Sequence, residues 1–117
     1  MKLGHIDLEN PQQVFNKIVK HLLKQNKQSI TSASCRYFGD DGLKCAVGCL
    51  IPKKLYIPEI EGRAYSIAFD TIKIKVDNAI TNRILAKTQY IHDIVEVKNW
   101  EQELKKLSVE LNLKFKK

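Results

Sequence analysis

The chain has 117 residues, with 44% hydrophobic and 28% charged side chains, which is ordinary for a globular protein. This length predicts one domain with one hydrophobic core, and the composition argues against disordered, collagen-like and membrane-spanning classes. Lysines and arginines number 20 against 13 aspartates and glutamates, a formal charge of +7, which favours a polyanion or an acidic protein as partner. Because only three of the cations are arginines, the charge favours nonspecific attraction over base readout.

The N-terminal region is unlike a signal peptide, because charged residues interrupt it and no apolar run precedes a cleavage site. No window approaches the run of about 18 apolar residues that a membrane span needs. We therefore expect a cytoplasmic protein, in the host cell if a phage encodes it, with no membrane partner. Cys35, Cys45 and Cys49 are an odd number in a chain expected to be cytoplasmic, and their spacing does not fit a zinc site, so they are expected to be free thiols in the core.

The first predicted element is a helix from about Pro11 to Asn26, because Asn10 is a favourable N-cap and proline fits the first helical turn. Apolar residues at helical spacing define its buried face: Val14, Phe15, Ile18, Val19, Leu22 and Leu23. Lysines occupy a narrow stripe on the opposite side, and we name these residues the lysine stripe: Lys17, Lys20, Lys24 and Lys27. No acidic residue lies between positions 11 and 27, so the outer face is expected to be purely basic.

A polar loop is predicted over Gln28–Ser34, followed by a β-hairpin. Two β-capable runs, Cys35–Phe38 and Leu43–Val47, flank an Asp-Gly turn signal. In this hairpin Gly42 is expected to supply a positive φ, and Gly48 a bulge or a close backbone approach.

The second half of the chain is expected to be mainly helical. Pro52 and Pro58 leave room only for a short turn or a single helical turn, and alternating residues over 72–76 predict a half-buried strand, part of which a following helix would absorb. A second long helix should begin at Asp77 or Asn78, and a third at Asn99, with a buried stripe of Trp100, Leu104, Leu107 and Leu111. The prediction is an α+β single domain, mostly helical, with three main helices and a small antiparallel β-hairpin or short sheet.

The segment from Tyr37 to Pro52 reads Tyr-x-Gly-x-Asp-Gly-x-Lys-Cys-Ala-x-Gly-x-Leu-Ile-Pro. With its flanking residues, this stretch resembles a family of small uncharacterised bacterial and phage proteins over roughly the first half of the chain, although Phe38 and Cys49 depart from the commonest form. The resemblance implies a phage, prophage or bacterial setting, in which such proteins often bind and block a host machine. It implies no established activity.

Signals for catalysis are weak. Gly39, Gly42 and Gly48 fit neither a P-loop nor a dinucleotide fingerprint, and no Cys-His-Asn/Asp order singles out Cys45 as a nucleophile. Carboxylates that would hold a metal if they converged are Asp40, Asp41, Glu59 and Glu61. We therefore lean against an enzyme and assign no catalytic residue, metal ligand or cofactor.

The leading functional prediction is a non-enzymatic binding or inhibitor protein that docks a basic surface on an acidic host protein or nucleoprotein. Its candidate contacts are Lys17, Lys20, Lys24, Lys27, Arg36 and Lys44. Two alternatives stay open: direct nucleic-acid binding, and a small metal- or thiol-dependent hydrolase centred on the hairpin. The sequence predicts neither the target nor the oligomeric state.

Overall fold

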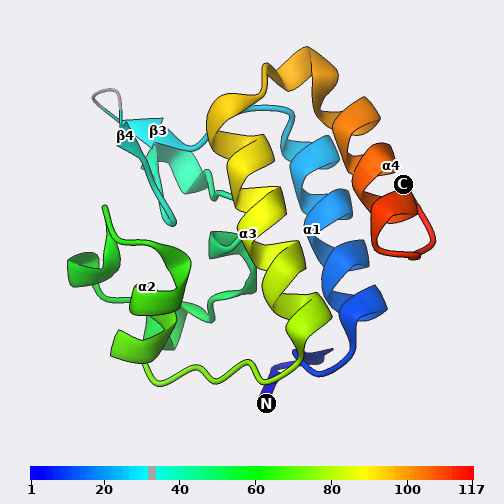
Figure 1. Ribbon diagram of the computed structural model, residues 1–117. Helices are drawn as coiled ribbons and strands as arrows, with labels where there is room; N and C mark the ends of the chain where they lie inside the picture. Colours follow the sequence, from blue (N-terminus) through cyan, green and yellow to red (C-terminus); the bar gives the residue numbers. More distant parts are fainter. Residues whose placement is uncertain (32–33) are drawn as a thin grey trace.

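Three long helices dominate the computed structural model, which describes residues 1–31 and 34–117 (Figure 1). These are α1 (Pro11–Gln25), α3 (Ala79–Ile94) and α4 (Trp100–Glu110), and each of the three contacts the other two. A short helix, α2 (Tyr65–Thr71), lies on the other side of α3 from α4. Two small antiparallel sheets complete the fold, β1 (Lys2–Leu3) with β2 (Ile6–Asp7) and β3 (Ile30–Thr31) with β4 (Ser34–Cys35). The mostly helical α+β class is confirmed.

The predicted helix boundaries are close to the observed ones because local signals set them. The Asn10 side chain accepts a hydrogen bond from the Gln13 N–H, and Asn26 ends α1 in a left-handed conformation. Asn78 caps α3 by accepting from two backbone amides, whereas Asn99 precedes α4 without a side-chain cap. The predicted stripe of α4 is buried throughout.

The predicted hairpin over 35–47 is wrong. Phe38 and Lys44 form only an isolated bridge, and the intended turn is a 3₁₀ helix, η1 (Asp40–Gly42). The cause is the carboxylate of Glu61, which accepts the backbone N–H groups of Tyr37 at 2.8 Å and Phe38 at 3.1 Å, so these donors do not go to a partner strand. Of the predicted loop, Ser32 and Ala33 lie outside the described residues.

The short 3₁₀ helix η2 (Gly48–Leu50) lies within the Tyr37–Pro52 motif, and η3 (Lys53–Leu55) and η4 (Pro58–Ile60) follow it. The single turn expected between the two prolines is therefore confirmed. Gly48 also makes the expected close approach, because a Cβ there would overlap the carbonyl of Tyr37. Gly42 has the positive φ expected of it, 76°.

The strand predicted over 72–76 is not formed. Helix α2 runs to Thr71, Lys73 turns the backbone with a φ of 62°, and the Ile74 N–H bonds to the carbonyl of Phe69. Ile72 and Ile74 are buried nevertheless. The alternating pattern therefore indicated which side chains are buried, although no strand forms there. The β1–β2 hairpin at the N-terminus was not predicted.

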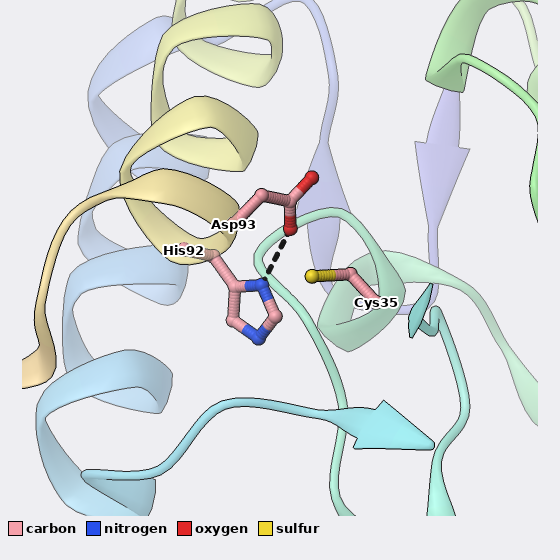
Figure 2. Close-up of side chains that lie close together, drawn as sticks. All are labelled: Cys35, His92 and Asp93. Carbon is pink, nitrogen blue, oxygen red and sulfur yellow. Dashed lines mark hydrogen bonds and ion pairs between the residues drawn. The ribbon is translucent and has the colours of Figure 1, made fainter. Parts of the chain in front are cut away.

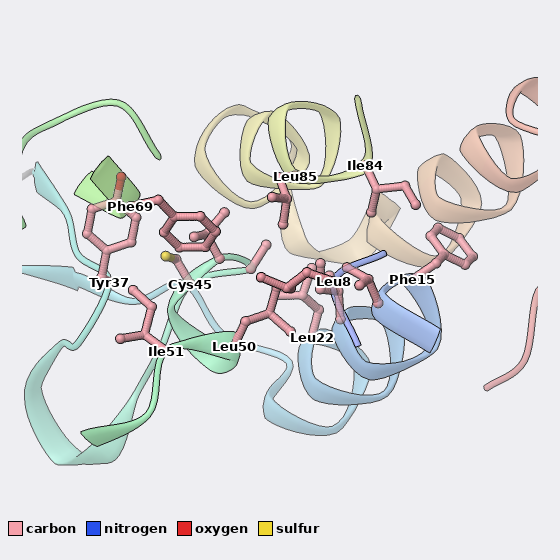
Figure 3. Close-up of a cluster of buried hydrophobic side chains, with 14 of the residues drawn as sticks. Leu8, Phe15, Leu22, Tyr37, Cys45, Leu50, Ile51, Phe69, Ile84 and Leu85 are labelled. Atoms are coloured by element: carbon pink, nitrogen blue, oxygen red, sulfur yellow. The ribbon is translucent and has the colours of Figure 1, made fainter. Parts of the chain in front are cut away.

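One hydrophobic core runs from the bundle into the irregular segment (Figure 3). Phe15 and Leu22 of α1 and Leu85 of α3 join, through Leu50, the group around Tyr37, whose other members are Cys45, Ile51 and Phe69. This packing holds the segment after β4 against the C-terminal half of α3, where Gln89 accepts a hydrogen bond from the Val47 N–H. Among the described residues, no helix is long and apolar enough to cross a membrane.

Candidate functional site

The lysine stripe is exposed along the outer face of α1 and the turn that follows it. Within residues 1–31 and 34–117, none of its four ammonium groups lies within 4.0 Å of a carboxylate, although five other lysines have such a partner. At a rise of about 1.5 Å per residue, Lys17 and Lys24 are separated by about 10 Å along the helix axis. The stripe is therefore a row of exposed positive charges that form no ion pair with the described part of the chain.

Lys44 lies beside this helix. Its backbone carbonyl accepts hydrogen bonds from the ring of His21 and the amide of Gln25, both on α1. Burial lowers the pKa of His21, and the positive charges of Lys17 and Lys44 lower it further. The Lys44 ammonium also lies 4.4 Å from the ring centroid of Phe38. Lys44 therefore adds its charge to the same region as the lysine stripe.

Arg36 is engaged differently. Its guanidinium Nε is 3.8 Å from the carboxylate of Glu61, which is the group that also accepts the Tyr37 and Phe38 amides. Because this carboxylate neutralises part of the charge of Arg36, we do not include Arg36 in the basic surface formed by the lysine stripe and Lys44.

A second cluster joins residues that are far apart in the sequence. The ligand atoms of Cys35, His92 and Asp93 lie within 4.8 Å of one another (Figure 2). Cys35 lies in β4, and His92 and Asp93 lie in the last turn of α3. From the sequence, only the adjacency of His92 and Asp93 could be recognised, because the position of Cys35 beside them depends on tertiary packing.

Hydrogen bonds fix the tautomer of His92, which is fully buried. Its Nε2 accepts from the backbone N–H of Ser29 at 2.9 Å, so in the neutral ring the proton is on Nδ1, which donates to Asp93 at 2.7 Å. Neither nitrogen is free to take a proton from a thiol. Two ligands of a tetrahedral zinc at about 2.0 Å would lie about 3.3 Å apart, so this short contact is a hydrogen bond and not the edge of a metal site.

The thiols are protonated at neutral pH. Burial, the charge of Asp93 and a hydrogen bond to Asp93, in that order of importance, together raise the pKa of Cys35 to about 11. Burial raises the pKa of Cys49 to about 12 and that of Cys45 higher still. Cys45 is a core residue as predicted, whereas Cys35 and Cys49 are half-buried. A reactive cysteine needs the opposite shift, so the cluster lacks the electrostatics of a thiol nucleophile.

Cys35 and Asp93 also border a cavity of about 440 Å³ between β4, the 62–65 segment and α3. Asp93 Oδ1 already accepts from His92 and from the Gln89 side-chain amide. The remaining lining residues are Ser34, Arg36, Tyr37, Cys45, Gly62, Arg63, Ala64, Tyr65 and Gln89.

The four carboxylates singled out from the sequence do not form a metal site. Among the residues described, the one group of three or more close ligands is the Cys35 cluster. Glu61 accepts from two backbone amides and from the Tyr56 hydroxyl at 2.8 Å, and Asp40 accepts from Thr31. The convergence that the hydrolase alternative requires is absent from this part of the chain.

Comparison with known proteins supplies no family for the chain. No protein-family model, no curated protein and no solved structure matches it.

Proposed function

We propose that this protein is a non-enzymatic binding protein that docks the lysine stripe, together with Lys44, on an acidic surface of a protein partner. The observation that supports this most is the absence of counter-ions, within the described residues, around four exposed lysines on helix α1 and the turn that follows it. Charges left uncompensated on one face speed association with an oppositely charged partner and orient it.

The composition of this surface favours an acidic protein over a nucleic acid. The stripe contains no arginine, which would clamp phosphates or read bases, and α1 carries its one aromatic residue, Phe15, in the core. Single-strand binding relies on exposed aromatic side chains on which bases stack. In the bacterial or phage setting implied by the Tyr37–Pro52 motif, the partner would be a host protein or nucleoprotein in the cytoplasm.

Charge reversal tests the proposal. Lys20→Glu/Lys24→Glu should lose most binding to a fluorescent polyglutamate peptide and most capture of partner from nuclease-treated bacterial lysate. The matched control is Lys53→Glu/Lys54→Glu, which changes the net charge equally at two exposed lysines of η3. Equal binding by both double variants would contradict the proposal.

If the partner is a nucleic acid, the lysate capture and a binding measurement give different results. Capture would disappear with nuclease, and fluorescence polarisation would show binding to a DNA or RNA duplex that falls steeply with rising salt. A duplex that binds the wild type and the Lys20→Glu/Lys24→Glu variant equally would exclude the stripe as the contact.

A further inference from the structure

The cavity of about 440 Å³ between β4, the 62–65 segment and α3 is lined by groups of both charges. Asp93 supplies a carboxylate, and Arg36 and Arg63 supply guanidinium groups. The chain has three arginines, and two of them line this cavity, whereas no lysine of the described residues does. A guanidinium binds a planar carboxylate through two parallel N–H bonds, so this choice of cation indicates recognition of an anionic group.

The carboxylate of Asp93 is only partly used by the protein. Its Oδ1 accepts from Nδ1 of His92 at 2.7 Å and from Nε2 of Gln89 at 2.9 Å. The other oxygen, Oδ2, points away from the His92 ring (Figure 2), and no nitrogen or hydroxyl group of the described residues donates to it. The side chain is 31% exposed. Since an ionised carboxylate has room for about four hydrogen bonds, Oδ2 can accept from a cationic group of a ligand.

Arg63 has free donors. Its side chain is exposed, and its Nε donates to the carbonyl of Glu59 at 3.3 Å, so within the described residues its terminal nitrogens have no hydrogen-bonded acceptor. The Nε of Arg36, by contrast, is 3.8 Å from the carboxylate of Glu61. The uncompensated positive charge of the cavity is therefore mainly that of Arg63, which matches a singly charged carboxylate better than a phosphate dianion.

The two charged groups lie at different depths. Asp93 is on the inner side, because Gln89, which donates to it, also accepts from the backbone N–H of buried Val47. Arg63 is on the outer side, within the run 62–64, whose three residues are all exposed. A ligand that enters the cavity therefore meets a positive group at the mouth and a negative group further in.

Two walls of the cavity are aromatic and fixed. The hydroxyl of Tyr37 donates to the carbonyl of Arg63, and that of Tyr65 donates to the Asn82 side chain at 2.9 Å. Because both hydroxyls donate to other residues, the tyrosines contribute mainly the apolar surface of their rings. Walls held by such bonds lose little freedom when a ligand binds, which favours affinity.

We propose that this cavity binds a small zwitterion of the amino acid type, with its ammonium group on Asp93 and its carboxylate on Arg63. A zwitterion satisfies both groups, whereas a simple anion would meet the carboxylate of Asp93 and a simple cation the guanidinium of Arg63. The volume lies in the usual range for small-molecule sites, about 300 to about 1,000 Å³. The inference does not depend on the proposed function, because neither the lysine stripe nor Lys44 lines the cavity.

Titration of ¹⁵N-labelled protein, followed by NMR, tests the inference. The probes are glycine, 4-aminobutyrate and 6-aminohexanoate, which carry the same two charges at increasing separation. At least one should shift the backbone amide signals of Gly62 and Ala64 and saturate, with a dissociation constant of about 5 mM or lower. The amine and the acid of the same chain length, each with one charge, should bind at least about tenfold more weakly.

Charge removal at each end identifies the contacts. Arg63→Gln should weaken binding of the zwitterion at least about tenfold and leave binding of the matched amine unchanged. Asp93→Asn should weaken the zwitterion equally and leave the matched acid no weaker. The controls are Arg83→Gln, at the arginine outside the cavity, and Asp70→Asn, at an exposed carboxylate of α2.

Three results would overturn the inference. They are the absence of saturable shifts at Gly62 and Ala64 with all three zwitterions, equal binding of a zwitterion and its single-charge analogues, and equal losses in Arg63→Gln and Arg83→Gln. Circular dichroism verifies that each variant is folded. If Asp93→Asn does not fold because of its bonds to His92 and Gln89, Arg63→Gln still decides, since its side chain is exposed.

Discussion

The imidazole Nε2 of His92 accepts a hydrogen bond from the backbone N–H of Ser29 at 2.9 Å, and both residues are fully buried. The bond joins the segment that follows α1 to the last turn of α3. The Gln28 side chain strengthens the same junction by donating to the His92 carbonyl at 2.9 Å. His92 is thus a structural acceptor at the centre of the cluster that most resembles a catalytic site.

His92→Phe should destabilise the protein by about 2 kcal/mol, because the ring volume is kept while a buried amide loses its acceptor. Chemical denaturation followed through circular dichroism measures the free energy of unfolding. Lys87→Ala on the exposed side of the same helix is the control and should change it by less than about 0.5 kcal/mol. A similar stability of His92→Phe and the wild type would show that water or another group satisfies Ser29.

Asp93→Asn should make Cys35 more reactive. Burial is the main cause of the raised pKa of Cys35, and the carboxylate charge adds to it, so removing that charge lowers the pKa. At pH 8 the rate of alkylation by iodoacetamide should rise about tenfold for each unit by which the pKa falls. Mass spectrometry of the labelled peptides gives the rate for each cysteine. Buried Cys45 reports on unfolding, since its rate should not change; a constant Cys35 rate would contradict the prediction.

Gly48→Ala should be severely destabilising, by more than about 3 kcal/mol, because the new Cβ meets the backbone carbonyl of Tyr37, which cannot move without displacing the segment that Glu61 holds. Gly42→Ala is the comparison. Its φ of 76° strains any other residue, but nothing lies within 4 Å of the added Cβ, so the cost should be about 1 kcal/mol. Thermal melting of the two variants ranks them, and equal losses would contradict the contact.

His21 makes stability depend on pH. Its folded pKa is lowered below 6.5 chiefly by burial, so between that folded value and 6.5 the unfolded chain binds more protons than the folded chain. The contribution of His21 is present above pH 6.5 and is lost as the pH falls below it. The melting temperature should therefore drop more steeply between pH 7 and pH 5 in the wild type than in His21→Gln. An NMR titration that places the midpoint of His21 at or above 6.5 would refute this.

The helices were predictable because their signals are local. Asn10 and Asn78 cap helices as side chains of that type usually do, and the apolar periodicity of α1 and α4 matches their buried faces. The outward position of the lysine stripe follows from the same periodicity.

The irregular segment was not predictable in this way. Alternation in Cys35–Phe38 favours an extended backbone, but it does not say whether a strand or a side chain receives the backbone donors, and here Glu61 does. The left-handed turn at Lys73 contains no glycine, the residue that would have indicated such a backbone conformation in the sequence. The meeting of Cys35 with His92 follows from packing between distant segments, and no short-range pattern encodes it.

The carboxylate of Glu61 has a consequence for self-assembly. An extended segment with free amide groups is a template on which another chain can add a strand, and exposed edges of that kind start fibrous aggregates. At Tyr37 and Phe38 these donors are already occupied by a side chain, so they are not available to an incoming strand. One glutamate thus closes an edge that most folds protect with a neighbouring strand, a proline or a bulge.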